Sequence, residues 1–185
     1  MKSRTHTLRI GSLTRELPLF EVQPGLSIAV LNILGDVELA QAAARELAPR
    51  LASHRPQVLV TPEAKSIPLA YALAAQMQLP YVVLRKTYKS YMGAALSATT
   101  TSITMGREQT LYLDEKDRPL FGGARAALID DVVSTGSTLV AMHEIVERAS
   151  GKVVCEAAIC TEGDPASWKH VIALAHLPLF KAEQH

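Results

Sequence analysis

Two adjacent acids stand directly before a loop of small hydroxyl residues in the stretch ALIDDVVSTGSTL, residues 127–139. The acids, Asp130 and Asp131, end an apolar run that is typical of a buried strand. In an open α/β sheet, ligands bind at the carboxyl ends of the strands. Carboxylates only accept hydrogen bonds, so the two acids suit sugar hydroxyls or the waters of a bound Mg²⁺, and they would repel a phosphate.

The loop after the acids has the composition of an anion site. A loop that enters a helix presents unpaired backbone N–H groups and the positive end of the helix dipole. Gly136 lets the backbone approach a ligand closely or take a positive φ. The other loop residues add hydroxyl donors: Ser134, Thr135, Ser137 and Thr138. A ligand with a phosphate at one end and a diol nearby meets both demands, so the stretch predicts a site for a ribose 5-phosphate.

Other interpretations of this stretch are limited by what the chain lacks. An apolar run that ends in acids also occurs in nucleoside triphosphatases, but the chain has no G-x-x-x-x-G-K-[ST] loop. It has no G-x-G-x-x-G fingerprint either, so a dinucleotide fold is unsupported. The alternative without a ligand is an ordinary helix N-cap beside two solvated acids.

Composition bounds the class of protein. The chain has 185 residues, 48% of them hydrophobic, and a formal net charge of +1. This length fits one domain, 1–185, and this charge gives no bulk attraction to nucleic acid or to an anionic membrane. The N-terminus lacks the apolar core of a signal peptide and no apolar run is long enough to span a membrane, so we expect a cytoplasmic protein. Cys155 and Cys160 lack zinc-site spacing and are interpreted as ordinary buried thiols.

Helical and apolar β segments alternate along the chain, which predicts an α/β fold with a mostly parallel sheet and helices on both faces. Asp36 fits a helix N-cap, and Gly151 fits the C′ position of the last helix. The Ser/Thr-rich segment 87–106 has little to build a core, and it predicts an exposed hairpin or a mobile lid. The expected helices are 37–52, 67–77 and 138–150, and the expected strands are 5–10, 14–22, 26–32, 57–61, 80–86, 110–113, 124–130, 152–160 and 170–177.

The stretch ALIDDVVSTGSTL resembles the phosphoribosyl pyrophosphate (PRPP) motif of the type I phosphoribosyltransferases. The resemblance covers roughly Pro24 to Cys160. VTPEAKSIPLA, residues 60–70, is similar to the pyrophosphate loop of the purine members, and LRKTYKSYMG, residues 84–93, is similar to the stretch after their third strand. Adenine and xanthine phosphoribosyltransferases look most similar.

This resemblance implies the type I fold with a small N-terminal β hood, about 1–35, and a β lid, about 87–108. It also implies a cytoplasmic, Mg²⁺-dependent homodimer that transfers ribose 5-phosphate from PRPP to a purine-type base, adenine-like first, and releases pyrophosphate. A PRPP-binding regulator or a non-catalytic family member is the alternative. By the same resemblance, Asp130, Asp131 and Lys65 are catalytic, and the bond Ala64–Lys65 is cis. The pyrophosphate site then consists of Glu63, Ala64, Lys65, Ser66, Arg85, Lys86 and Lys89.

The sequence departs from these relatives where a base would exchange a proton. The adenine enzymes carry a lid glutamate where this chain has Thr104, two positions before Gly106, and the 6-oxopurine enzymes carry an acid where it has Ser134. We therefore expect slow turnover with adenine and hypoxanthine unless Glu108 or Glu162 replaces the missing carboxylate. Trp168 could border the base pocket, although a single tryptophan is more often a packing residue.

Overall fold

A parallel sheet of five strands forms the centre of the computed structural model, which describes residues 4–101 and 108–181. The strand order is β10-β9-β8-β4-β5, and every neighbouring pair is parallel. The bounds of these strands are β4 Val58–Pro62, β5 Tyr81–Leu84, β8 Arg125–Val133, β9 Lys152–Glu162 and β10 Val171–Leu177. The predicted α/β class and the parallel sheet are confirmed. No helix in these described residues is long and apolar enough to cross a bilayer.

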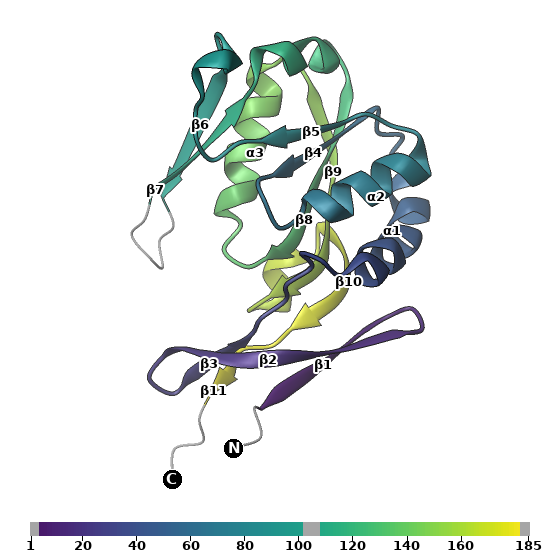
Figure 1. Cartoon of the computed structure of the whole chain (residues 1–185), viewed down its shortest axis with the longest axis vertical. Coiled ribbons are helices and arrows are strands. Elements are labelled where there is room, and N and C mark those ends of the chain that lie inside the picture. The colour runs from purple at the N-terminus through teal and green to yellow at the C-terminus, as the bar shows by residue number, and fades with distance from the viewer. Residues whose placement is uncertain (1–3, 102–107, 182–185) are drawn as a thin grey trace.

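Helices cover both faces of the sheet, as predicted (Figure 1). The helices α1, Val37–Ala52, and α2, Ile67–Met77, have the bounds expected from the sequence and share one hydrophobic core with the N-terminal strands. The helix α3, Ser137–Arg148, packs on the other face in a second core. Such a sheet is buried on both faces, which is why all five residues of β4 are buried.

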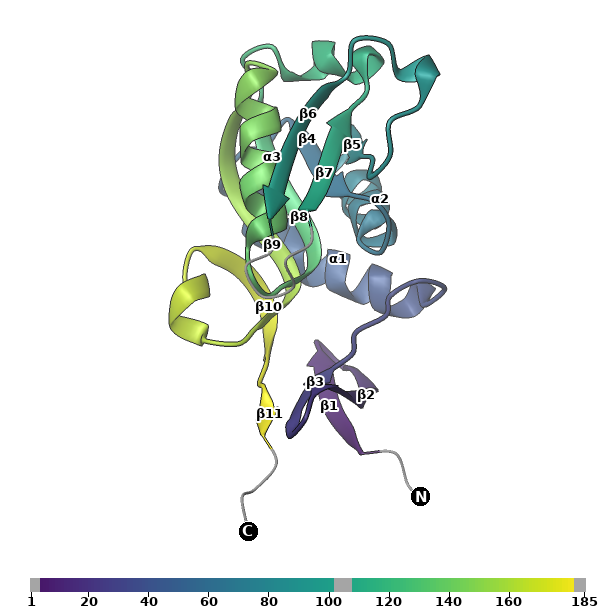
Figure 2. The same ribbon diagram turned by 90° about the vertical axis from the view of Figure 1, so that its left-hand side faces the viewer.

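An antiparallel hairpin, β6 (Leu96–Thr101) and β7 (Glu108–Leu113), lies beside α3 (Figure 2). Its buried residues include Ala98, Leu111 and Leu113, which join the core around α3. The expectation that 87–106 has little to contribute to a core is therefore wrong in part, because Ala98 and Met92 are almost fully buried.

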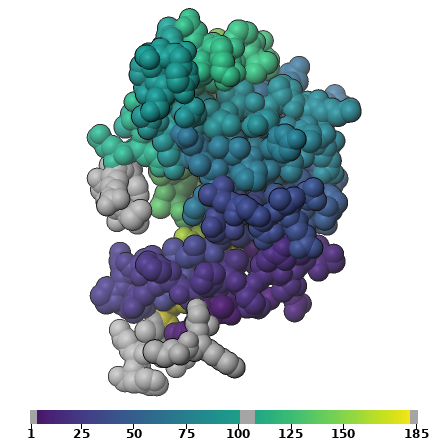
Figure 3. Space-filling model, in the orientation of Figure 1, coloured from purple at the N-terminus to yellow at the C-terminus, as the bar shows by residue number. Residues whose placement is uncertain are grey.

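The hood is a separate four-stranded sheet below the body of the protein in Figures 1 and 3, with its N-terminal strands in purple and β11 in yellow. Its strands are β1 Thr5–Ile10, β2 Leu13–Gln23, β3 Leu26–Ala29 and β11 Phe180–Lys181, in that order. The sequence predicted the N-terminal strands but missed β11, which pairs antiparallel with β3. Because β11 follows directly after β10, this pairing joins the hood to the carboxyl end of the central sheet.

The helix α3 ends at Arg148, two residues before the predicted end, and its C′ position is one residue earlier than predicted. Ser150, and not Gly151, takes the left-handed conformation, with φ 66°. The Gly151 N–H donates to the Val146 carbonyl at 2.8 Å, which places Gly151 at the C″ position of a Schellman-type end. Glycine is still required there, since a Cβ would lie 2.9 Å from Val146 Cγ1 and 3.2 Å from Phe121 Cδ1.

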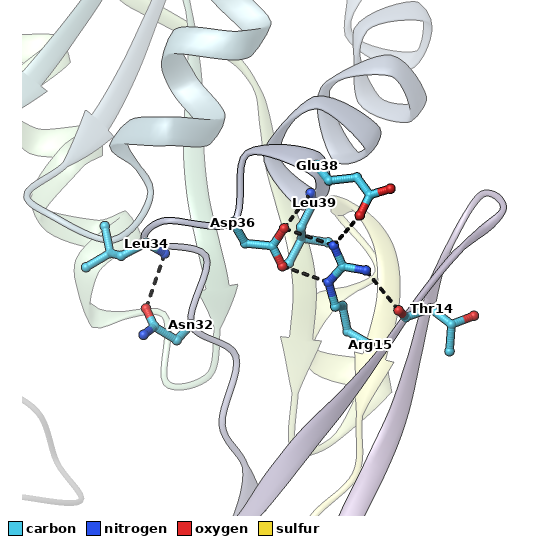
Figure 4. A network of polar contacts seen from close by, with 7 residues as sticks. All are labelled: Thr14, Arg15, Asn32, Leu34, Asp36, Glu38 and Leu39. Atoms are coloured by element: carbon cyan, nitrogen blue, oxygen red, sulfur yellow. Dashed lines mark hydrogen bonds and ion pairs between the residues drawn. The ribbon is translucent and has the colours of Figure 1, made fainter.

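Arg15 of β2 fastens the hood to the N-terminus of α1 (Figure 4). Its guanidinium donates to both Asp36 carboxylate oxygens, at 2.7 and 3.0 Å, and to Glu38 Oε2 at 2.7 Å. Asp36 is also the predicted N-cap of α1 and accepts from the Leu39 N–H at 3.0 Å. The Arg15 guanidinium and the Leu39 N–H both hold the pKa of Asp36 below its usual value. One carboxylate thus caps the helix and sets where the hood attaches.

We expect Asp36→Ala to lower the free energy of unfolding by about 0.5–2 kcal/mol, because the α1 cap is lost. Asp36→Asn keeps a side-chain acceptor for the helix and should lose clearly less. Urea denaturation measures both, with Glu38→Gln as the control for the exposed ion pair. Equal losses in the Asn and Ala variants would show that the charge facing Arg15, and not the cap, stabilises this junction.

Candidate active site

The strands β4 and β8 lie side by side in the middle of the sheet, and their carboxyl ends open into one cavity of about 350 Å³. From β4 the chain moves outward to β5, whereas from β8 it moves the other way to β9 and β10. This reversal is the topological switch point at which open α/β sheets bind ligands. The cavity brings together Asp130 and Asp131 at the end of β8, Lys65 after β4, and Lys86 after β5.

The two acids occupy different surroundings. Asp130 is only 8% exposed and accepts a hydrogen bond from the Asp131 N–H at 2.9 Å, whereas Asp131 is half-buried. Burial, reinforced by the charge of Asp131, raises the pKa of Asp130 well above its usual range. A carboxyl in this state holds a proton readily, and it can meet a diol as donor or as acceptor. A cation bound nearby would return the carboxyl to its ionised form.

The hydroxyl loop enters α3 as predicted, and it surrounds a second, smaller cavity of about 30 Å³. Ser134, Thr135, Gly136 and Thr138 line this cavity, together with Asp130. The N–H groups of Thr135 and Gly136 make no hydrogen bond to any described residue. Gly136 has φ 75°, a conformation that favours glycine. Ser137 does not line the cavity, and its hydroxyl lies 3.0 Å from Thr135 Oγ1.

The loop after β4 presents backbone N–H groups and the Lys65 side chain to the larger cavity. Lys65 is exposed, and the N–H groups of Ala64, Lys65 and Ser66 make no hydrogen bond to a described residue. The Ser66 hydroxyl points inward, where it donates to the Pro62 carbonyl at 3.1 Å and accepts from the Thr61 hydroxyl at 2.8 Å. The cis bond of this loop is Glu63–Ala64, so the expectation of a cis Ala64–Lys65 bond is wrong by one residue.

Glu63 does not face the cavity as a free carboxylate. One of its oxygens lies 3.2 Å from Arg85 Nε, and the other accepts from the Lys86 N–H at 2.9 Å. The Lys86 N–H first, and then the Arg85 side chain, hold the pKa of Glu63 below its usual value. Glu63 therefore ties the loop after β4 to the end of β5. In this way an acid can belong to an anion site without repelling the anion.

The remaining predicted residues either lie away from the cavity or lie outside the described part of the chain. Lys89 does not line the cavity, and it begins the short 3-10 turn η1, Ser90–Met92. Thr104 and Gly106 lie outside the described residues. Glu108 begins β7 and pairs with Thr101, while its neighbour Gln109 lines the cavity. No sequence signal identified Gln109, because only the pairing of the hairpin places its side chain near the acids.

A larger cavity, about 610 Å³, lies elsewhere, between α1 and α2. Its lining is mostly apolar, with Ala40, Ala44, Pro68 and Ala72 among the residues. It holds neither the acid pair nor the loops with free N–H groups. The cavity of about 350 Å³ at the switch point combines one buried and one half-buried acid, two lysines and free backbone N–H groups. It is therefore the candidate active site.

Comparison with known proteins agrees with this geometry. The model of the phosphoribosyl transferase domain matches residues 32–176. The chain belongs to this family. A hypoxanthine/guanine phosphoribosyltransferase of Methanococcus voltae is 34% identical over 109 residues, 59% of this chain and 54% of the relative. A xanthine phosphoribosyltransferase of Chloroflexus aurantiacus is 33% identical over 129 residues, 70% of this chain and 60% of the relative.

The family also includes a regulator among the similar proteins. The purine biosynthesis transcriptional repressor PurR of Bacillus subtilis is 29% identical over 132 residues, 71% of this chain and 46% of the repressor. The matched part of this chain thus spans between 46% and 60% of the length of these three relatives. Membership of the family is established, whereas the activity has to be argued from the site.

Solved structures support the fold. The adenine phosphoribosyltransferase of Thermoanaerobacter pseudethanolicus superposes with a TM-score of 0.67 at 18% identity, covering 93% of this chain and 95% of that one. The enzyme from Giardia lamblia, complexed with 9-deazaadenine, gives a TM-score of 0.66 at 17% identity, covering 98% and 94%. The coverage includes the hood, so the small sheet belongs to the shared architecture.

The ends of β9 and β10 add titratable groups beside the candidate site. Glu162 is half-buried at the end of β9, and burial raises its pKa, an effect that His176 partly offsets. The Thr161 hydroxyl lies 3.0 Å from His176 Nδ1, which fixes the ring. Burial first, then the charges of Asp131 and Glu162, raise the pKa of the Cys160 thiol to about 12, so Cys160 is an unreactive thiol between the two acids.

We expect Glu162→Gln to raise the melting temperature at about pH 8 and to change it little near pH 4. A carboxyl whose pKa is raised on folding stabilises the folded state only while protonated, and this contribution is lost as the pH rises through the folded pKa. The control is Glu16→Gln, whose carboxylate accepts from the Thr7 and Thr5 hydroxyls and has a lowered pKa. Its removal should destabilise at the higher pH instead. The same sign for both variants would contradict the burial of Glu162.

Proposed function

We propose that this protein transfers ribose 5-phosphate from PRPP to a purine-type base and releases pyrophosphate. One observation carries the proposal. Asp130 lines both the small cavity inside the hydroxyl loop and the larger cavity that contains Lys65. A ligand at this point therefore meets phosphate donors on one side, carboxylates in the middle and cations on the other. PRPP carries a 5-phosphate, a ribose diol and a pyrophosphate in that order.

The chain's own residues supply binding and charge management for this reaction. The hydroxyl loop and its free N–H groups hold the 5-phosphate, and Asp130 and Asp131 hold the ribose hydroxyls. Lys65, Lys86 and the N–H groups of the loop after β4 receive the leaving pyrophosphate. Negative charge on the acid pair favours the positive charge that develops at C1′. Arg85 is positioned by Glu63 rather than held free, and the hairpin β6–β7 would exclude water as a lid.

Mg²⁺ fits the donor set at this site. The two carboxylates and the sugar diol offer oxygen atoms, which Mg²⁺ prefers together with several of its own waters. Among the described residues no group of three possible metal ligands occurs, so Asp130 and Asp131 would hold the ion through PRPP and water. The bound ion would neutralise part of the pyrophosphate charge.

We also propose that the protein is cytoplasmic.

The base is proposed to be a purine, with adenine first. The hood and the end of β9 face the same end of the sheet as the acid pair, and this is where the base would lie (Figure 1). Ser134 cannot exchange a proton as a carboxylate does, and Thr104 offers only a hydroxyl. Of the two alternatives we favour Glu162, since burial favours its protonated form. Glu108 is exposed at the start of β7.

A homodimer is also part of the proposal. The strand β5 is the edge of the central sheet that leads to Arg85 and Lys86. Exposed apolar residues gather beside it, among them Tyr71 and Tyr81, whose rings meet edge to face at 6.2 Å. Packing of a second copy against α2 and β5 would bury them. Analytical ultracentrifugation measures the association directly.

A PRPP-binding regulator is the second candidate. It is favoured by the similarity to the Bacillus subtilis repressor and by the missing carboxylates at Thr104 and Ser134. Such a protein would use the same PRPP site without turning the ligand over.

Measured pyrophosphate release separates the candidates. We expect turnover with PRPP, Mg²⁺ and at least one of adenine, guanine, hypoxanthine and xanthine, with slow rates because the usual proton-transfer group is absent. Calorimetry with PRPP alone is run in parallel. Tight PRPP binding without turnover of any base would support the regulator. Absence of both binding and turnover would overturn the assignment of the site.

Lys65→Ala should weaken PRPP and pyrophosphate by about tenfold to hundredfold, the usual contribution of one charged contact. Ribose 5-phosphate should bind as before, because it has no group that reaches the loop after β4. Lys152→Ala, which removes an exposed lysine at the start of β9, is the charge-matched control. Equal weakening of all three ligands by Lys65→Ala would mean that Lys65 supports the loop and not the pyrophosphate.

A further inference from the structure

The only tryptophan of the chain lies against the glycine of the hydroxyl loop. A Cβ placed on Gly136 would lie 2.9 Å from Trp168 Cη2 and 3.0 Å from Cζ3. The edge of the indole therefore covers the side of Gly136 from which a side chain would project. Two constraints therefore require glycine at position 136. Its φ of 75° favours glycine, and Trp168 fills the space that a side chain would occupy.

The indole is fixed at its other end. Trp168 Nε1–H donates to the Glu162 carbonyl at 2.9 Å, at the last residue of β9. Trp168 also ends the 3-10 turn η3, Pro165–Trp168, whose start is capped by Asp164 accepting from the Ala166 N–H at 3.0 Å. The ring packs on the core around α3 as a half-buried side chain. A side chain held at both ends is a rigid support rather than a mobile cover.

The hydroxyl loop has few supports of its own. Ser134 and Thr135 are exposed, and the helix start at Gly136 has no side-chain cap. The contacts within the loop are the Thr135–Ser137 hydroxyl pair and a long bond from the Ser137 N–H to Thr135 Oγ1 at 3.4 Å. A phosphate must find the free N–H groups already converging, or binding has to include the cost of ordering them. Contact with Trp168 lowers that cost.

We propose that Trp168 is a positioning residue for the 5-phosphate site, which it joins to the loop between β9 and β10. This inference rests on the proposed function, since it assigns the phosphate of a phosphoribosyl ligand to the hydroxyl loop. It differs from the expectation that Trp168 borders the base, because the indole edge faces the phosphate loop. Trp168 then holds the phosphate loop against the loop that follows Glu162 before any ligand binds.

The experiment measures ribose 5-phosphate and PRPP affinity by calorimetry, and the KM for the base that turns over. Trp168→Ala should weaken both phosphate ligands by about tenfold, the cost of ordering one or two loop residues, and leave the KM of the base unchanged. Trp168→Phe keeps a ring against Gly136 and loses the hydrogen bond to Glu162, so it should weaken them less. Phe121→Leu, in the same core at the far end of α3, is the control. It should lower the melting temperature without changing either affinity.

A double-mutant cycle tests the contact itself. Gly136→Ala should cost less phosphate affinity in the Trp168→Ala background than in the wild type, because the space beside Gly136 has been vacated. In the wild type, the fluorescence of Trp168 should change with the same saturation curve that calorimetry gives for ribose 5-phosphate, a readout that needs no variant.

The outcomes separate the two proposals. Wild-type protein that binds neither ribose 5-phosphate nor PRPP would overturn the proposed function and this inference together. Normal wild-type binding that Trp168→Ala leaves unchanged, or additive effects in the cycle, would overturn the role of Trp168 alone. A rise in the KM of the base with unchanged phosphate affinity would likewise overturn it and would return Trp168 to the base pocket.

Discussion

Parallel pairing of β4 with β8 is the constraint on which the site depends. Both strands end at the same edge of the sheet, and each is followed by a loop that enters a helix N-terminus. Two sets of backbone donors therefore face one space made of two neighbouring cavities, whose linings share Asp130. Neither loop forms such a space alone, because a single helix N-terminus offers only one cluster of N–H groups.

Pairing and burial decide which side chains at this site present a charge to the cavity. Glu63 is neutralised by Arg85 and by the Lys86 N–H, whereas Asp130 is buried beside Asp131 with a raised pKa. Lys65 stays exposed at the cavity. The result is a pocket with an acidic centre and a positive flank, although the whole chain carries a formal charge of only +1. The proposed anion binding therefore depends on local geometry and not on bulk charge.

The chain belongs to the family but departs from its motifs at two positions. These departures leave one chemical step unassigned, the proton transfer to or from the base. The residue types that the proposed phosphoribosyl site needs are all present, whereas Thr104 and Ser134 stand where the resemblance places the group that exchanges a proton with the base. The end of β9 supplies one carboxyl whose pKa is raised, Glu162, because the fold partly buries it. Whether the protein is an enzyme or a sensor depends on that half of the pocket.

The sequence by itself determined the α/β class, the bounds of α1 and α2, and the entry of the hydroxyl loop into α3 at Gly136. These depend on local signals: apolar runs, a capping Asp36, and small residues at a helix start, each of which acts within a few positions of the chain. Only the tertiary structure decided that β11 completes the hood, that Glu63 pairs with Arg85, that Gln109 lines the cavity and that Trp168 lies against Gly136. Each of these is a contact between residues far apart in the chain, which depends on strand order, pairing and packing that local composition does not encode.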